Sequence, residues 1–215
     1  MILQKIRDPV SSLTHLAGAV LGVFCTAALI YKAIPYGPLY LTAFGIFGAT
    51  LVMLYTTSAI YHMPKSTGES LLVLRRIDHS MIFFLIAGTY TPTCLIPLRG
   101  PWGWSILAVV WGLALAGTCM KIFWIQAPRM LSTSIYVVMG WIVIVAFYPL
   151  LNAVSATAFA FLLTGGLLYT LGAVIYALKW PPMPFKWFGF HELFHVFVLL
   201  GSAFHVLFMF QLYPG

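Results

Sequence analysis

The segment Phe190-His191-Glu192-Leu193-Phe194-His195 opens an apolar run that continues to about Tyr213. On a helix, His191 and His195 project from one face about one turn apart, because four residues advance the chain by slightly more than one turn. Two imidazoles in this arrangement can bind one metal ion together. The same stretch also matches His-Glu-x-x-His, the zinc-protease pattern in which the histidines bind the metal and the glutamate acts as base. The pattern alone leaves both interpretations open.

The composition predicts an integral membrane protein. Of the 215 residues, 62% are hydrophobic and 7% are charged, whereas a soluble domain carries roughly 25% charged residues. A helix that crosses the bilayer needs about 20 apolar residues, so the chain has room for about six or seven spans joined by short loops. We therefore expect one all-α membrane domain over residues 1–215.

Hydrophobic runs bounded by charged residues, proline and glycine predict seven transmembrane helices. The expected spans are 13–34, 39–62, 76–98, 103–122, 131–150, 155–178 and 191–212. The first run superficially resembles a signal peptide, but it reaches transmembrane length without a convincing cleavage site, so we expect it to be retained. Glycines inside the spans, Gly165 and Gly166 among them, are expected where helices pack closely. The proline-rich stretch 180–184 cannot be regular helix.

The basic residues predict the orientation of these spans. Nine of the eleven lysines and arginines fall in the N-terminal segment and in three loops, 63–76, 121–130 and 179–190. Only Lys32 and Arg99 fall on the other side. Because positively charged loops stay on the cytoplasmic side, the N-terminus is predicted in the cytoplasm and the C-terminus outside.

The net charge of +7 does not indicate a nucleic-acid partner, because the longest basic run is Arg75-Arg76 and the topology accounts for the excess. The three cysteines, Cys25, Cys94 and Cys119, lie in separate apolar stretches without a CxxC pair. We expect them to be inert buried thiols.

Polar side chains from three predicted spans fall at one depth, near the cytoplasmic ends. His62 ends the second span, with Ser58 about one turn deeper on the same face. Asp78 begins the third span, and His191 and His195 begin the seventh. An acid inside a span costs about 2.5–3.5 kcal/mol on insertion scales, and less near the interface. Asp78 is therefore expected to have a partner or a function.

This set of residue types is suited to zinc hydrolysis. Three neutral imidazoles with an open fourth position form a catalytic zinc site, so we predict that His62, His191 and His195 bind Zn²⁺. Zinc lowers the pKa of a bound water to about 7. Asp78 would take a proton from that water and later return it to a leaving group, and Ser58 would hydrogen-bond the water or the substrate oxygen. The set predicts a hydrolase site that opens toward the inner leaflet.

Each residue also has an ordinary structural interpretation. A single intramembrane histidine more often hydrogen-bonds between helices. Asp78 could pair with Arg75 or Arg76, and Ser58 could bond to its own backbone carbonyl one turn back. Glu192, which a zinc protease would use as base, could equally stabilise the helix N-terminus. The convergence of five such residues at one depth favours the metal site.

Three further histidines need separate treatment. His205 lies ten residues past His195, about 15 Å deeper by helical rise, and cannot complete the same ligand set. His79 points about 100° away from Asp78 on the same helix. His15, near the cytoplasmic end of the first span, has a compatible depth and is a reserve ligand.

Four groups of residues, spread over nearly the whole chain, form a specific combination. They are Asp8-Pro9 with Thr14-His15 and Gly18; Ser58-x-x-Tyr61-His62; Asp78-His79 with Ala87-Gly88-Thr89-Tyr90-Thr91-Pro92; and His191-Glu192-x-Phe194-His195 with Gly201 and His205. Together they resemble the hemolysin III proteins, the bacterial branch of the progestin and adiponectin receptor family within the CREST membrane hydrolase superfamily. The resemblance implies a seven-helix protein of the bacterial inner (plasma) membrane with a cytoplasmic N-terminus. It also implies zinc on His62, His191 and His195, with Ser58 and Asp78 lining the site.

The resemblance also implies a lipid substrate. The receptor relatives and the more distant alkaline ceramidases look like hydrolases of lipid amides, and the bacterial members are associated with membrane lipid homeostasis. We therefore expect a zinc-dependent hydrolase of an amide or ester bond in a membrane lipid. Two alternatives stay open: a membrane sensor or receptor with structural zinc, and the pore-forming haemolysin that the family name suggests. A pore predicts a polar stripe along several spans, whereas these polar groups cluster at one end.

Overall fold

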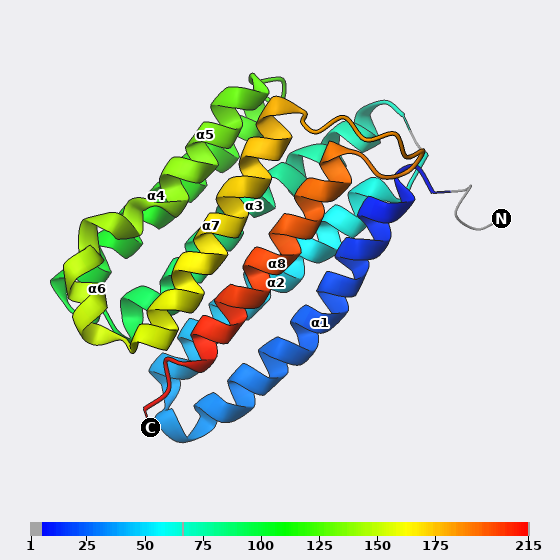
Figure 1. Cartoon of the computed structure of the whole chain (residues 1–215). Coiled ribbons are helices and arrows are strands. Elements are labelled where there is room, and N and C mark those ends of the chain that lie inside the picture. Colours follow the sequence, from blue (N-terminus) through cyan, green and yellow to red (C-terminus); the bar gives the residue numbers. More distant parts are fainter. Residues whose placement is uncertain (1–5, 66, 215) are drawn as a thin grey trace.

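The computed structural model, which describes residues 6–65 and 67–214, is a bundle of long helices (Figure 1). The helices in these residues are α1 (Pro9–Ala33), α2 (Pro38–His62), α3 (Glu69–Leu95), α4 (Pro101–Phe123), α5 (Arg129–Gly140), α6 (Phe147–Ala153), α7 (Ala156–Leu178) and α8 (Phe190–Phe210). Two 3-10 turns, η2 (Ile34–Tyr36) and η3 (Ile142–Ala146), join neighbouring helices. The predicted all-α class is confirmed.

Six helical segments of the described chain are long and apolar enough to cross a membrane. They are Pro9–Tyr36, Pro38–His62, Pro101–Phe123, Arg129–Ala153, Ala156–Leu178 and Phe190–Phe210. The remaining long helix, α3, is less apolar, because it carries Asp78 and His79 near one end and the stretch Thr89-Tyr90-Thr91-Pro92-Thr93 near the other. The protein is therefore a multi-pass membrane protein.

Three of the expected spans differ from the observed helices by more than a few residues or in regularity. Helix α1 begins at Pro9 rather than at residue 13, because proline is well accommodated in the first turn of a helix. Helix α3 begins at Glu69 rather than at residue 76, directly after Gly68 with a φ of 86°. The expected span 131–150 is not one regular helix, because the backbone tightens into η3 after Gly140.

Helix α8 lies between α1 and α7, with α2 on its far side in Figure 1. The chain packs α1 on α2, α2 on α3 and α3 on α4, and α8 returns to contact α1. The start of α1, the end of α2 and the start of α8 consequently meet at one end of the bundle (Figure 1). This arrangement brings residues from distant parts of the sequence together.

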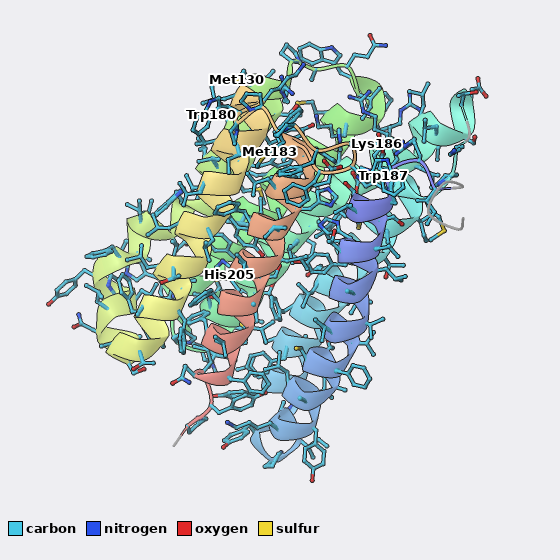
Figure 2. All side chains as sticks on the ribbon, turned by 45° about the vertical axis from the view of Figure 1, so that its right-hand side comes forward. Met130, Trp180, Met183, Lys186, Trp187 and His205 are labelled. Carbon is cyan, nitrogen blue, oxygen red and sulfur yellow. The ribbon has the colours of Figure 1, made fainter. Side chains whose placement is uncertain are left out.

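The segment 179–189, which precedes α8, is irregular, as the prolines predicted. It contains a cis peptide bond between Trp180 and Pro181. Figure 2 shows Trp180, Met183 and Trp187 at the same end of the molecule as Met130, whereas His205 lies deeper in the bundle. Trp180 and Trp187 expose large aromatic surfaces there, as expected for side chains at a membrane interface.

Two expectations about small residues need correction. A Cβ at Gly165 would lie 2.9 Å from the His205 ring, so this glycine does permit close packing, but Gly166 has no atom within 4 Å of that position. The expectation of three buried thiols is confirmed only for Cys94, because Cys25 is half-buried and Cys119 is exposed on α4. Gly165 and Gly166 differ because neighbouring residues on a helix point to different faces.

Candidate metal centre

The imidazoles of His62, His191 and His195 meet where α2 ends and α8 begins. One nitrogen from each ring lies within 4.8 Å of the others, and the Nε2 atoms of His62 and His191 are 3.3 Å apart. His62 and His195 are almost completely buried, and His191 is half-buried. We refer to these three residues as the histidine cluster.

The spacing in the histidine cluster suits a small tetrahedral ion. Zinc–nitrogen bonds are about 2.0–2.1 Å long, so two ligands at a tetrahedral angle lie about 3.3–3.4 Å apart. The 3.3 Å separation between His62 and His191 matches this value. Three neutral nitrogen donors are also the ligand set of a zinc site that keeps its fourth position open.

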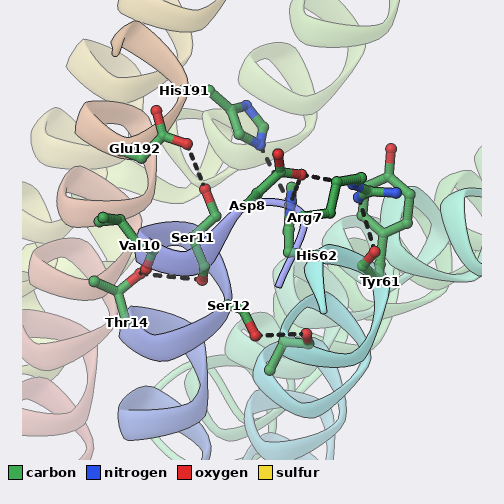
Figure 3. Close-up of polar contacts among 11 residues, drawn as sticks. Arg7, Asp8, Val10, Ser11, Ser12, Thr14, Tyr61, His62, His191 and Glu192 are labelled. Carbon is green, nitrogen blue, oxygen red and sulfur yellow. Dashed lines mark hydrogen bonds and ion pairs between the residues drawn. The ribbon is translucent and has the colours of Figure 1, made fainter. Parts of the chain in front are cut away.

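Asp8 orients His62 within the cluster (Figure 3). The Oδ2 atom of Asp8 lies 2.9 Å from Nδ1 of His62 and 2.8 Å from Nε of Arg7. When Nδ1 of His62 donates to the carboxylate, Nε2 is left with a lone pair directed at the other two histidines. The hydrogen bond with His62 lowers the pKa of Asp8 to about 2, and Arg7 contributes in the same direction.

Backbone hydrogen bonds hold Asp8 in this position. The amide of Asp8 donates to the His62 carbonyl at 3.1 Å, and the amide of Arg7 donates to the Met63 carbonyl at 3.2 Å. The Arg7 guanidinium also donates to the Tyr61 carbonyl at 2.8 Å (Figure 3). The start of α1 is thereby joined to the end of α2. Asp8 was not among the predicted site residues. The sequence feature that could have indicated it is the following Pro9, because proline is common in the first turn of a helix and so places Asp8 at the start of α1.

Glu192 stabilises the start of α8. Its Oε2 accepts a hydrogen bond from the Gly189 amide at 2.8 Å, and its Oε1 accepts one from the Ser11 hydroxyl at 2.7 Å (Figure 3). The first bond caps the helix, and the second ties α8 to α1. Glu192 has the capping role that its sequence position allowed.

His15, the reserve ligand, lies beside the histidine cluster without belonging to it. Its ring stacks on His195 with 3.7 Å between centroids and an angle of 11° between planes. Tyr55 meets the His15 ring edge-on at 5.0 Å. Both His15 nitrogens are buried and have no hydrogen-bond partner among the described residues. His15 therefore packs α1 against α8 behind a cluster residue.

Asp78 and Ser58 line the same cavity as His191 and His195. The Ser58 hydroxyl lies beside the Asp78 carboxyl and interacts with it. The alternative pairing of Asp78 with an arginine is not seen in the described part of the chain, where Arg7 and His62 pair with Asp8. The structure thus leaves the Asp78 carboxyl facing the cavity.

The cavity itself is long and mostly apolar. Its volume is about 520 Å³, within the roughly 300–1,000 Å³ usual for ligand pockets. On α3 its lining extends from Arg75 to Thr93, which corresponds to about 27 Å by helical rise. The far end is lined by apolar side chains such as Leu150 and Phe159, and His205 lines it part of the way along. The cavity can therefore accept an elongated apolar molecule whose polar end reaches the histidine cluster.

A family match and two bacterial relatives point to the same protein family. Residues 3–206 match the family described as "Haemolysin-III related". The chain is 41% identical over 205 residues to "Hemolysin-3" of Bacillus cereus, covering 93% of this chain and 89% of that protein. It is 41% identical over 196 residues to "Hemolysin-3 homolog" of Bacillus subtilis (strain 168), covering 90% and 88%.

A more distant relationship extends beyond bacteria. The human "Monocyte to macrophage differentiation factor" is 26% identical over 167 residues, covering 74% of this chain and 66% of that protein. The family match spans nearly the whole chain, and the two Bacillus relatives match over most of their own length. On this basis, the chain belongs to the Haemolysin-III related family.

Proposed function

We propose that this protein is a zinc-dependent membrane hydrolase that cleaves an amide or ester bond of a membrane lipid. The observation that carries the proposal is the common cavity: His191, His195, Asp78 and Ser58 line one end of a space whose remainder is long and apolar. Metal ligands, a proton acceptor and a hydrogen-bond donor would then face the same substrate. The three close imidazole nitrogens support the zinc ligand set.

Asp78, Ser58 and Asp8 have different roles in the proposed hydrolysis. Zinc, when bound, polarises the scissile carbonyl and makes water acidic enough to react near neutral pH. Asp78 accepts a proton from the attacking water and returns it to the leaving amine or alcohol. Ser58 donates a hydrogen bond to Asp78 or to the substrate oxygen. Asp8 keeps His62 in the tautomer that can bind metal.

The apolar part of the cavity would hold an acyl chain. Packing of the chain against the cavity walls fixes the carbonyl beside the histidine cluster, so the reacting groups are held in position. A bilayer lipid can reach such a site without leaving the membrane. This arrangement favours a lipid over a soluble substrate.

The charge distribution supports a cytoplasmic orientation of the site. Most of the basic residues lie in loops or in adjoining helix ends, at the end of the bundle where α1 and α8 begin (Figure 1). Because such loops stay in the cytoplasm, we place the histidine cluster at the cytoplasmic side of the bacterial inner membrane, with seven spans and the C-terminus outside. The product would be released into the inner leaflet.

The test compares Asp78→Asn with Glu192→Gln. The zinc-loaded wild type, in neutral detergent, is incubated with a panel of amide-linked and ester-linked acyl lipids, and released fatty acid is measured. We expect Asp78→Asn to reduce hydrolysis about 10²–10⁴-fold while it keeps one zinc per chain, because general-base catalysis contributes about that much. Glu192→Gln should keep most of the activity, since an amide oxygen can still accept the Gly189 hydrogen bond.

Two outcomes would contradict the proposal. Zinc-loaded wild type that hydrolyses no lipid in the panel would favour a sensor in which zinc is structural. Equal hydrolysis by Asp78→Asn and wild type would remove Asp78 from the mechanism. If Glu192→Gln were the inactive variant, the zinc-protease assignment of roles would replace this one.

A further inference from the structure

The polar end of the cavity has an unbalanced charge. Among the described residues that line it, Arg75, Lys121 and Arg129 are cationic, whereas Asp78 is the one carboxylate. These three basic residues come from the start of α3, the end of α4 and the start of α5. None of them is a predicted zinc ligand or has a role in the proposed hydrolysis. We refer to them as the cationic triad.

Lys121 is the most unusual member of the cationic triad. Its side chain is 2% exposed, and its ammonium donates a hydrogen bond to the Ser132 hydroxyl at 2.5 Å. The structure shows no ion pair between this ammonium and a carboxylate of the described residues. A buried charge is costly unless an opposite charge or several hydrogen bonds compensate it. One hydroxyl does not supply that compensation.

Arg129 and Thr133 add further unsatisfied donors. The Arg129 guanidinium lies over the Tyr176 ring, with 5.5 Å between its central carbon and the ring centroid, and makes a cation–π contact there. Its Nε is buried without a hydrogen-bond partner in the described part of the chain, and the same holds for the Thr133 hydroxyl. Ser132 and Thr133 follow Arg129 by three and four residues on α5, so both lie beside it on the surface of the helix. All three residues line the cavity.

The cationic triad lies at the level where a lipid headgroup would sit. Met130, the neighbour of Arg129, is at the same end of the molecule as Trp180 and Trp187 in Figure 2. Exposed tryptophans mark the boundary between hydrocarbon and water. The apolar continuation of the cavity leads from this level into the bundle.

We propose that the cavity selects an acyl lipid whose headgroup carries a phosphate with net negative charge. Lys121 and Arg129 hold the phosphate from α4 and α5, and Arg75 approaches from α3. Guanidinium and ammonium groups are the usual phosphate ligands in proteins, and the Thr133 hydroxyl, which has no partner among the described residues, offers a further hydrogen bond to its oxygens. This inference rests on the proposed function where it names the substrate class, but binding alone tests it.

The experiment measures thermal unfolding of the zinc-loaded protein in neutral detergent. The protein is titrated with dioleoylphosphatidylglycerol, with dioleoylphosphatidylcholine, and with inorganic phosphate. We expect a saturable increase in Tm with phosphatidylglycerol and a much smaller one with the zwitterionic lipid or free phosphate. Equal shifts with both lipids would contradict the charge selection, and a full shift with inorganic phosphate would assign the site to a free anion.

Lys121→Met and Lys186→Met form a matched pair. Lys186 is exposed at the same end of the molecule and lies over the Trp187 ring (Figure 2). We expect Lys121→Met to weaken phosphatidylglycerol binding at least tenfold and to keep or raise the Tm without lipid, because an uncompensated charge is removed. Lys186→Met should bind like wild type. A lower Tm with an unchanged response to lipid would mean that Lys121 is only structural.

Two further variants keep the inference separable from the proposed function. Arg129→Gln should also weaken phosphatidylglycerol binding, and it decides the question if Lys121→Met does not fold. Asp78→Asn should bind phosphatidylglycerol at least as tightly as wild type, because it removes the one carboxylate among the described lining residues and so cannot weaken the attraction for an anionic headgroup. If no lipid is hydrolysed but binding depends on Lys121 and Arg129, the anionic lipid is a ligand and only the hydrolase proposal fails. Binding that is insensitive to both residues overturns the inference.

Discussion

His195 and His205 lie on the same helix and line the same cavity, but the side chains that surround them are different. Both are buried, at 2% and 6% exposure, and both belong to α8. His195 lies close to His62 and His191, in the first turns of the helix. His205, deeper in the bundle, stacks on the Tyr169 ring with 5.1 Å between centroids and packs against Gly165.

The comparison shows that burial of a histidine does not make a metal site. At the level of His195, three helix ends bring nitrogen donors and the carboxylate of Asp8 together. At the level of His205, the nearby polar groups are hydroxyls: Ser202 contacts the hydroxyls of Tyr55 and Tyr169 at 2.5 and 2.8 Å. Hydroxyls hold helices together but are poor ligands for zinc, which favours nitrogen, sulfur and carboxylate donors.

The largest expected difference between the two levels is in metal content. His195→Ala should lose bound zinc after dialysis, because two histidines cannot complete a three-nitrogen site. His205→Ala should keep about one zinc per chain. Metal analysis of the two purified variants beside wild type measures this difference. Equal zinc in all three proteins would show that the histidine cluster does not hold the metal.

A smaller effect is expected from the group that orients the cluster. Asp8→Asn keeps the shape of the side chain but removes its negative charge, so the hydrogen bond to His62 weakens. Such partners of metal ligands typically contribute 10–100-fold to metal affinity, and we expect a loss in that range by competition with a chelator. Ser12→Ala, which removes a hydroxyl bonded to the Ala59 carbonyl between the same two helices, should leave zinc affinity unchanged. A similar loss in both variants would point to general loosening of the contact between α1 and α2.

The smallest effect concerns packing at the His205 level. Gly165→Ala places a methyl group 2.9 Å from the His205 ring and 3.1 Å from the Gly201 carbonyl oxygen, and overpacking of this kind costs about 1–3 kcal/mol. Gly166→Ala meets no atom within 4 Å and should keep or slightly raise stability. Thermal unfolding of the two zinc-loaded variants measures the difference, and zinc content should be unchanged in both. A Gly165→Ala variant as stable as wild type would mean that α7 and α8 can move apart.

Helical rise and hydrophobic pattern were enough to predict which residues share a level. The expected depth placed Ser58, His62, Asp78, His191 and His195 together, and the structure brings all five to the region where the cavity meets the histidine cluster. Zinc on this cluster stays a prediction. Depth could be predicted because a membrane span fixes both the direction and the rise of its helix.

Asp8 and Lys121 show where this reasoning fails. Asp8 fell outside the expected first span because that span was placed at residue 13, whereas α1 begins at Pro9. Lys121 was counted as a loop charge, whereas it is buried in the last turn of α4 and faces the cavity. Asp8 is half-buried and bonded to His62 at the end of α2, whereas neighbouring helices cover Lys121 almost completely.

The sequence by itself determined the membrane class, the helical architecture and the level at which polar residues accumulate. These properties depend on the hydrophobicity and periodicity of single helices, which can be derived from one segment at a time. The tertiary structure alone decided that Asp8 holds His62, that Glu192 caps α8, and that Lys121 lines the cavity without a carboxylate partner among the described residues. Contacts of this kind depend on the rotation and packing of several helices at once, and no single span contains that information.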